Sequence, residues 1–388
     1  MEEKKLSLYE KVLLISMIMG SGLSFNKVYL YHIFFVINFL YWGIIKKFKI
    51  KKNLLKENII IIIFFIYSSM HMFFIEDYIL AIKNQIYILL GVSIFFTIKI
   101  LLNKNKNEVL NIFKKIFILA CFIGVLETIN LFRWYVSPYD LNISYPAAFY
   151  WNTNDFATIL IGIFPFVFFM KNFYKKIIFF SIVFYLLKKC DSRSNEIALI
   201  IEIFIFLLLI LQKSNPFNKI LIIFIGIFTT FLLKKQILSK FLVLYDLIFV
   251  SISSSDSLGV RKALILNLLS ELKKTYVFLF GTGGGNSIVV HKIKNNTHGM
   301  LSNHSFFLEL FVEYGVFIFS LLGIYYLKLI YRNFKFYLKT NNYINGSLFI
   351  SLIGFSIGLN SMSGVIYFFP FWVLLGVADF YSHSTRNG

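Results

Sequence analysis

Long runs of apolar residues alternate with short polar segments along almost the whole chain. A helix needs roughly 20 apolar residues to cross the hydrocarbon core of a membrane. By that measure the runs predict about twelve membrane-spanning helices, several of them short. They lie near residues 9–25, 28–45, 59–75, 86–102, 116–131, 156–170, 177–187, 197–211, 220–233, 306–327, 344–360 and 364–380. The pattern predicts an all-α, polytopic integral membrane protein in which residues 1–388 form a single membrane domain.

One polar interruption is much longer than the others and covers residues 234–305, between the ninth and tenth expected spans. Within it, residues 257–274 have the spacing of an amphipathic helix that begins after Asp256 or Ser257 as its N-cap. We therefore expect a large, partly helical loop. No internal repeat relates the two halves of the chain, as an inverted-repeat transporter would require.

Positive charge is distributed unevenly between the two ends of the expected spans. With the N-terminus in the cytoplasm, the inner segments hold 23 Lys and Arg residues and the short outer loops hold six. Lys and Arg concentrate in short cytoplasmic loops, and long loops are exempt from this rule. We therefore expect both termini in the cytoplasm and residues 234–305 on the outer side. Because Lys4 and Lys5 precede the first apolar run and no Ala-x-Ala site follows it, we expect a retained span there.

The composition narrows the class of protein further. The chain is 58% hydrophobic and 15% charged, which excludes a disordered or fibrous protein. Its two cysteines cannot form a disulfide framework. The net charge of +20 is accounted for by inner lysines beside anionic lipid headgroups, so it gives no indication of nucleic-acid binding.

Arginine is rare in this chain, with five residues against 34 lysines, and Arg133, Arg193 and Arg261 lie on the expected outer side. A retained Arg favours planar, bidentate recognition of a phosphate or carboxylate. Arg193 lies in the tight connection 191–196, where neighbouring hydroxyls suit a diphosphate, unless this segment only caps the next helix. Arg261 falls near the middle of an apolar stripe close to the positive end of its helix. There it needs an anionic partner, unless it reaches past the helix end. The stripe contains Leu264, Ile265, Leu268, Leu269 and Leu272, and the opposite face contains Lys262, Asn267, Ser270, Lys273 and Lys274.

Other polar residues near the outer side are candidates for binding or catalysis. The segment 281–286, Gly-Thr-Gly-Gly-Gly-Asn, lacks the spacing of a nucleotide-binding loop, so it is either a turn or a close approach of backbone to a ligand. His304 directly precedes the tenth span and is either a general base for a sugar hydroxyl or an interfacial histidine. His291, His298 and His304 lack the carboxylate or thiolate companions of a zinc site, so we expect neither a metal nor a cofactor.

Several carboxylates lie within or at the ends of the expected spans. Asn152, Asn154 and Asp155 open the sixth span, either as a helix cap or as ligand-binding groups. Glu127 and Glu202 lie inside spans five and eight, and intramembrane carboxylates are functional candidates by default. They could equally pair with an outer arginine.

These motifs resemble, in order and on the expected side, those of the bacterial O-antigen ligase and polysaccharide polymerase superfamily. His304-Ser305, followed after nine residues by Gly315, resembles the family's segment that closes its large outer loop, although Ile318 departs from the last position of that segment. The resemblance covers residues 145–380. Its other elements are Gly259-Val-Arg261, Gly281-Thr-Gly283, Ser192-Arg-Ser194 and Asn152-x-Asn154-Asp155-x-Ala157.

The resemblance implies a metal-independent glycosyltransferase at the outer face of the bacterial cytoplasmic membrane. Such an enzyme takes a glycan from an undecaprenyl-diphosphate donor. It implies that Arg193 and Arg261 hold the diphosphate and that His304 assists the acceptor hydroxyl. Expected partners are the lipid-linked oligosaccharide, membrane lipids and other polysaccharide-assembly proteins. The substrate-binding roles that it implies fall on Asn152, Asn154, Asp155, Gly281, Gly283, Asn303 and Glu309.

The motifs do not distinguish a polymerase from a ligase. The Lys-, Ile-, Phe- and Asn-rich composition is typical of an AT-rich genome and suggests a Gram-positive source, where capsule or teichuronic-type polymers need a polymerase and no lipid-A core exists. We therefore favour a polymerase. The alternatives are transfer to a lipid, protein or wall acceptor, as by a ligase, and a flippase for lipid-linked oligosaccharides, which would need no histidine at the rim of an outer loop.

Overall fold

The computed structural model describes residues 4–25, 28–40, 58–75, 77–134, 145–150, 152–213, 257–294, 296, 305–362 and 364–383. Helices make up nearly all of the regular structure in these residues, so the expectation of an all-α fold is confirmed. The helices are α1 (Leu8–Met19), α2 (Leu30–Leu40), α4 (Ile59–His71), α5 (Tyr78–Lys104), α6 (Lys106–Thr128), α7 (Thr153–Phe168), α8 (Phe173–Cys190), α9 (Arg193–Lys213), α12 (Ser257–Leu272), α13 (Thr275–Phe280), α14 (Asn286–Lys294), α15 (Phe306–Thr340), α16 (Tyr343–Gly358) and α17 (Phe369–His383). Four 3-10 helices and two short strands join them, namely η1 (Gly20–Leu23), η3 (Met72–Phe74), η4 (Leu359–Ser361), η5 (Val365–Tyr367), β1 (Ser24–Phe25) and β2 (Val28–Tyr29).

Five of the described helices are long and apolar enough to cross a membrane. They are α5, α6, α9, α15 and α16 extended through η4. The apolar helices α2, α4 and α7 are shorter. The chain is therefore an all-α protein with membrane-spanning character over the part that the structure describes.

The first expected span is shorter in the structure than its apolar run. Helix α1 has 12 residues and is too short to cross a bilayer by itself, and η1 and β1 take up the rest of the run. Strands β1 and β2 pair in antiparallel fashion, so the chain reverses between the first and second expected spans. Helix α2 begins the second of these spans, and residues 41–45 of that span lie outside the described residues. The expected ninth span, 220–233, and residues 234–256 of the expected loop lie outside the described residues.

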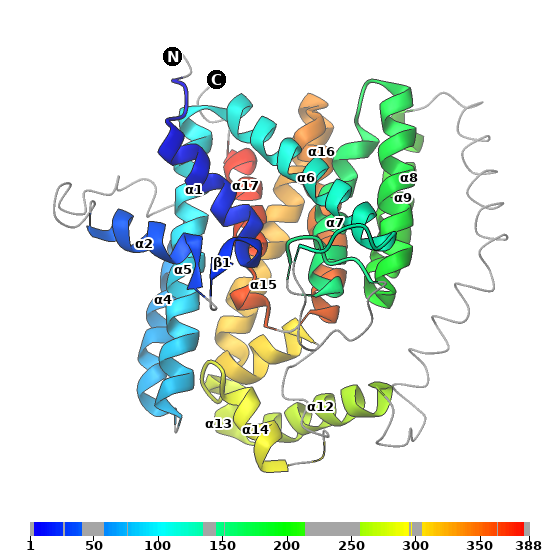
Figure 1. Ribbon diagram of the computed structural model, residues 1–388. Coiled ribbons are helices and arrows are strands. Elements are labelled where there is room, and N and C mark those ends of the chain that lie inside the picture. Colours follow the sequence, from blue (N-terminus) through cyan, green and yellow to red (C-terminus); the bar gives the residue numbers. More distant parts are fainter. Residues whose placement is uncertain are drawn as a thin grey trace.

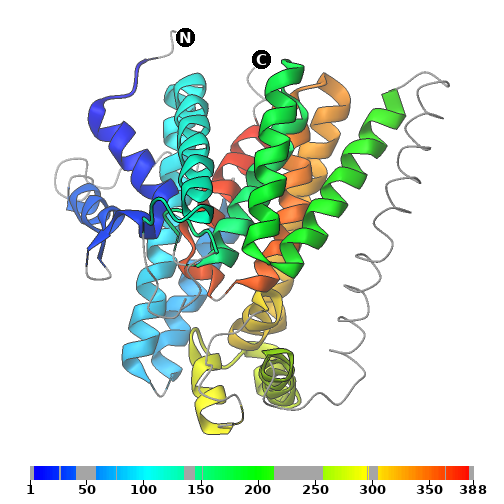
Figure 2. The same ribbon diagram turned by 45° about the vertical axis from the view of Figure 1, so that its right-hand side comes forward.

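The long helices run side by side, and both chain termini lie at the same end of the bundle (Figure 1, Figure 2). Helices α12, α13 and α14 lie together at the opposite end, and α12 runs across the direction of the bundle (Figure 1). Within the bundle, α16 packs against α7, α9, α15 and α17. The chain passes from α16 to α17 at the end of the bundle where α12 lies (Figure 1).

A buried ion pair joins two helices that are far apart in sequence. Lys99 of α5 pairs with Asp379 of α17, and its Nζ also donates to Asn58 Oδ1 at 2.9 Å. All three side chains are buried. Charges removed from water are stable only when they are paired and hydrogen-bonded, so this contact fixes how α5 lies against α17.

Candidate functional site

Helices α7 and α9 begin beside each other, and a hydrogen-bond network holds their first turns together. Thr158 Oγ1 donates to Asn195 Oδ1 at 3.3 Å, and Asn195 Nδ2 donates to Ser192 Oγ at 2.9 Å and to Ser361 Oγ at 3.1 Å. Asn195 is fully buried. The network therefore ties the 191–196 connection to α7 and to η4 at the end of α16.

The start of α7 has the cap that its sequence predicts. Asn152 Oδ1 accepts the backbone N–H of Asp155 at 2.9 Å, which satisfies one of the unpaired donors of the first turn. Asn154 contributes its backbone carbonyl to Thr158 Oγ1 at 2.8 Å. Asp155 Oδ1 is buried and has no hydrogen-bond partner within the described residues. Asn152 thus has a structural role, and Asp155 retains an acceptor oxygen at this helix end.

Arg193 is the first residue of α9, and its side chain is exposed. Arg261 of α12 is half-buried. Burial lowers the pKa of its guanidinium, and the positive charge of Arg193 lowers it further. A like charge acts in this way only over a short distance, so the two arginines lie close enough for their charges to interact. Neither guanidinium makes an ion pair or a hydrogen bond within the described part of the chain. Arg193 itself stands at the N-terminus of α9 beside that of α7, and helix N-termini attract anions.

Helix α12 forms where its sequence predicts, but the buried face is shifted. Val260, Leu264 and Leu268 are buried, whereas Leu269, which the predicted stripe included, is 44% exposed. Asn267, predicted on the polar face, is buried and exchanges hydrogen bonds with Asn296 at 2.7 and 3.1 Å. The prediction for Asn267 was wrong because periodicity records the average polarity of a face and cannot show a buried amide pair.

The glycine segment 281–285 packs against the first part of α15. Thr282 N–H donates to Val312 O at 2.8 Å, and Gly283 N–H donates to Glu313 O at 2.9 Å. A Cβ on Gly281 would lie 2.3 Å from Glu313 O, so only glycine fits there. In this structure the glycine segment comes close to another backbone segment of the protein, which agrees with the interpretation of 281–286 as a turn. Direct substrate binding by Gly281 and Gly283 stays a prediction.

The facing segment carries a kink at Gly315, where φ is 72° inside α15. A Cβ on Gly315 would lie 2.3 Å from Leu279 O. Each of the two glycines, Gly281 and Gly315, therefore lies against the backbone just before the other. The buried carboxylate of Glu313 accepts the Ser287 hydroxyl at 2.5 Å and the backbone N–H groups of Gly285 and Ser287. Glu313 therefore caps α14 and fixes the glycine segment on α15.

A polar cluster that the sequence did not reveal lies under the glycine segment. Asn84 Nδ2 donates to Tyr314 OH at 2.8 Å, and Tyr367 OH donates to Asn84 Oδ1 at 3.2 Å. The carboxylate of Glu309, in the first turn of α15, acts electrostatically on both tyrosine hydroxyls. In the sequence Asn84 lies in the polar triplet Lys83-Asn84-Gln85 just before the expected span 86–102, which gave no sign of a buried role, and tyrosines give none in a chain so rich in aromatic residues.

The remaining candidate residues are Glu127, Glu202, Asn303 and His304. Glu127 accepts the N–H groups of Ala147 at 2.8 Å and Ala148 at 2.7 Å, so it organises the chain before α7. Both carboxylate oxygens of Glu202 are buried without a hydrogen-bond partner among the described residues. His304 and Asn303 lie outside the described residues, immediately before Ser305 and the start of α15.

The two other histidines of the expected outer loop, His291 and His298, form no metal centre in the described part of the chain. His291 is fully buried in α14, with Nδ1 3.4 Å from the Asn267 amide nitrogen, and His298 lies outside the described residues. No group of three or more His, Cys, Asp or Glu side chains that could hold a metal ion occurs among the described residues.

No protein-family model matches the chain, and no curated protein matches its sequence. The class that the fold defines is an all-α protein with helices long and apolar enough to span a membrane.

Proposed function

We propose that this protein is a membrane glycosyltransferase that acts on an undecaprenyl-diphosphate-linked glycan. The observation that carries the proposal is that Arg261 lies within charge-interaction distance of Arg193, which begins α9 beside the start of α7. Two arginines and two helix N-termini then contribute positive potential in this part of the protein. Among the described residues, no carboxylate is paired with either arginine. A diphosphate suits such a region because each guanidinium can donate two parallel hydrogen bonds to it.

The expected topology supports an outward-facing site. Both termini lie at one end of the bundle and α12, with Arg261, lies at the other (Figure 1). The excess of Lys and Arg in the alternate short segments assigns the end with the termini to the cytoplasm. The site would then face outward from a bacterial cytoplasmic membrane, where nucleotide-activated sugars are scarce and a lipid diphosphate serves as the activated donor.

The proposed transfer step uses the two arginines together with His304. The oxygen of an acceptor hydroxyl attacks the anomeric carbon of the donor glycan, and the bond from that carbon to the diphosphate oxygen breaks. His304 accepts the hydroxyl proton, and undecaprenyl diphosphate leaves with its new negative charge stabilised by Arg193 and Arg261. The buried Oδ1 of Asp155 has no partner among the described residues and would accept a hydrogen bond from a sugar hydroxyl once the substrate reaches it.

We favour a polymerase, in which the acceptor is a further lipid-linked repeat unit. A ligase would use the same groups with another acceptor. A flippase would instead move the lipid-linked oligosaccharide across the bilayer without cleaving the bond to the diphosphate. These alternatives therefore differ in the product that each forms.

The test uses the purified full chain in lipid nanodiscs with an undecaprenyl-diphosphate-linked oligosaccharide. We expect longer glycans together with released undecaprenyl diphosphate, and loss of both with Arg193→Ala or Arg261→Ala. The exposed Lys273 follows the far end of α12 and provides the control, because Lys273→Ala removes a positive charge from the same region of the chain without touching the arginine pair. Translocation of the oligosaccharide without release of the diphosphate would show a flippase. Release only in the presence of a different acceptor would show a ligase.

A further inference from the structure

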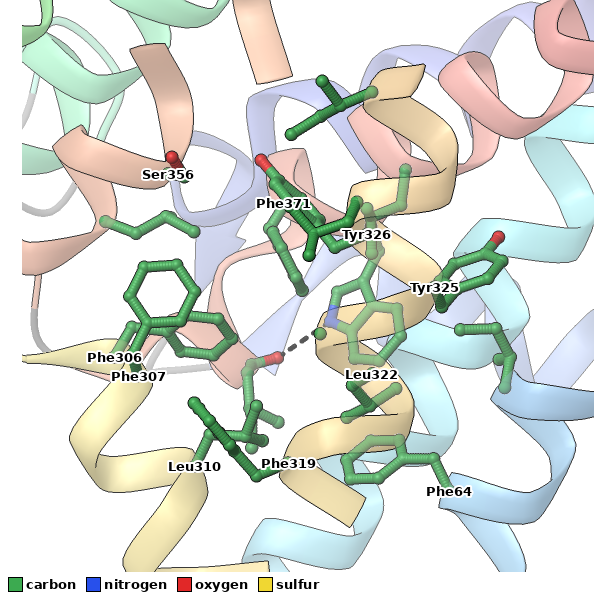
Figure 3. Close-up of a pocket in the computed structure, with 18 residues that line it drawn as sticks. Phe64, Phe306, Phe307, Leu310, Phe319, Leu322, Tyr325, Tyr326, Ser356 and Phe371 are labelled. Atoms are coloured by element: carbon green, nitrogen blue, oxygen red, sulfur yellow. Dashed lines mark hydrogen bonds between the residues drawn. The ribbon is translucent and has the colours of Figure 1, made fainter. Parts of the chain in front are cut away.

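A cavity of about 370 Å³ lies beside α15, bounded also by α4, α16 and α17 (Figure 3). Its wall is almost entirely apolar, and aromatic rings form much of it. Those that face the cavity most clearly are Phe64, Phe306, Phe307, Phe319, Tyr326 and Phe371 (Figure 3). Such a wall excludes a polar ligand and suits a hydrocarbon.

Three of the polar groups of the wall are hydrogen-bonded to backbone carbonyls. Tyr326 OH donates to Leu352 O at 2.6 Å, Ser356 Oγ to Ile353 O at 2.7 Å, and Trp372 Nε1 to Ile366 O at 3.1 Å. These three groups therefore do not need a ligand to satisfy them. The hydroxyl of Tyr325, which also lines the cavity, is buried without a hydrogen-bond partner among the described residues. An occupant of the cavity would gain from dispersion and from leaving water.

The cavity is open on the outer surface of the bundle. A Cβ placed on Gly323 would meet no atom within 4 Å, and Leu327, one turn further along α15, is 64% exposed. Both residues lie on a helix long and apolar enough to cross a membrane. A lipid chain could therefore enter sideways from the bilayer.

The other boundary of the cavity reaches the candidate site. Leu359 lines the cavity, and Ser361, two residues further in the same turn, accepts the hydrogen bond from Asn195 next to the start of α9. Phe306, at the head of the cavity, directly follows Ser305. The cavity and the start of α9, where Arg193 lies, are thus on two sides of one short turn, η4.

We propose that this cavity holds the first isoprenoid units of the lipid-linked substrate whose diphosphate lies at Arg193 and Arg261. The proposal rests on the proposed function and adds where the lipid chain binds. An isoprenoid chain carries a methyl branch on every unit, and the rigid aromatic walls provide large contact surfaces for such branches at little cost in side-chain entropy. The continuity across η4 favours the substrate's own chain over an unrelated membrane lipid.

Gly323 offers a way to fill the cavity without disturbing the protein around it. Gly323→Trp places an indole where no protein atom lies within 4 Å of the new Cβ. Gly323→Ala tests the effect of helix propensity alone. Ile324→Trp is the matched control, because Ile324 is adjacent on α15, is 62% exposed and does not line the cavity.

The measurement is the affinity of the full chain in detergent for three probes, namely undecaprenyl diphosphate, farnesyl diphosphate and inorganic diphosphate. We expect the wild type to bind the two isoprenoid probes at least about tenfold more tightly than inorganic diphosphate. Gly323→Trp should remove most of that preference and leave the affinity for inorganic diphosphate unchanged. Ile324→Trp and Gly323→Ala should behave as the wild type.

The outcomes distinguish failure of this proposal from failure of the proposed function. If Gly323→Trp keeps the full preference for isoprenoid probes while Arg261→Ala loses all three ligands, the cavity is not the isoprenoid site and the diphosphate site stands. If Arg193→Ala and Arg261→Ala bind inorganic diphosphate as the wild type does, the proposed function fails. Equal competition by a phospholipid without a diphosphate would assign the cavity to ordinary acyl chains and overturn the proposal.

Discussion

At the scale of single residues, the most informative contrast is between paired and unpaired cations. Lys99 and Lys104 each meet a carboxylate, whereas the half-buried Arg261 meets the charge of Arg193. A partly desolvated cation beside a like charge is unfavourable until an anion arrives. The scarcity of arginine marked both residues as candidates. Their convergence could not be predicted, because it depends on how α12 and α9 pack in three dimensions.

The first prediction concerns the geometry of Arg261. If its guanidinium grips a diphosphate with a bidentate fork, Arg261→Lys should lower transfer at least about tenfold and come close to Arg261→Ala, because a point charge cannot make two parallel hydrogen bonds. Polymer yield, normalised to protein in the membrane, is the measurement. Full activity of Arg261→Lys would mean that the residue only anchors α12 at the headgroups.

The second prediction concerns His304, which lies next to the head of α15. His304→Ala should lower transfer by about 10²–10⁴-fold, as loss of a general base typically does. Binding of undecaprenyl diphosphate should stay at the wild-type level, because the arginine pair is unchanged. Near-normal transfer by His304→Ala would make it an interfacial residue without a catalytic role.

At the scale of elements, helix positions were easier to predict than the contacts between helices. The amphipathic pattern located α12 correctly, but α1 covers only part of the first expected span and is followed by η1 and β1. Apolar composition cannot distinguish a crossing from a short helix beside a hairpin, since both need a hydrophobic surface. Likewise, the glycines of 281–285 were visible in the sequence, but their partner, the kink at Gly315, is a long-range contact.

The third prediction concerns that contact. Gly281→Ala and Gly315→Ala should each lower the free energy of unfolding by about 1–3 kcal/mol or more, because both need a left-handed backbone and leave no room for a Cβ. Gly323→Ala on α15 is the control and should be neutral or slightly stabilising. Thermal unfolding in detergent measures the difference. Equal stability of all three variants would contradict the packing of 281–285 on α15.

The fourth prediction concerns the ion pair between α5 and α17. Lys99→Met or Asp379→Leu alone should destabilise the protein by about 3–5 kcal/mol, because each leaves an uncompensated buried charge. The double variant should recover most of that loss. If the double variant is as unstable as the sum of the single ones, Lys99 and Asp379 do not act as a pair.

At the scale of the whole molecule, the structure places the chain termini and α12 at opposite ends, and the charge pattern predicts that the end with the termini is cytoplasmic. A reporter fused near Lys294 of α14 should be extracytoplasmic, and one fused near Lys335 of α15 should be cytoplasmic. The same orientation for both reporters would contradict the arrangement of the bundle in a membrane. Cytoplasmic labelling near Lys294 would remove the basis for an external lipid-linked donor.

The mutual fit of Gly281 and Gly315 has a consequence for the evolution of this sequence. Lipid-facing positions can exchange one apolar residue for another with little effect, so those positions are free to diverge. Neither glycine can change alone, because each accommodates the backbone of the other's segment. Distant relatives should therefore retain this pair at a similar separation even where the rest of the alignment has faded, and the pair gives a way to find them.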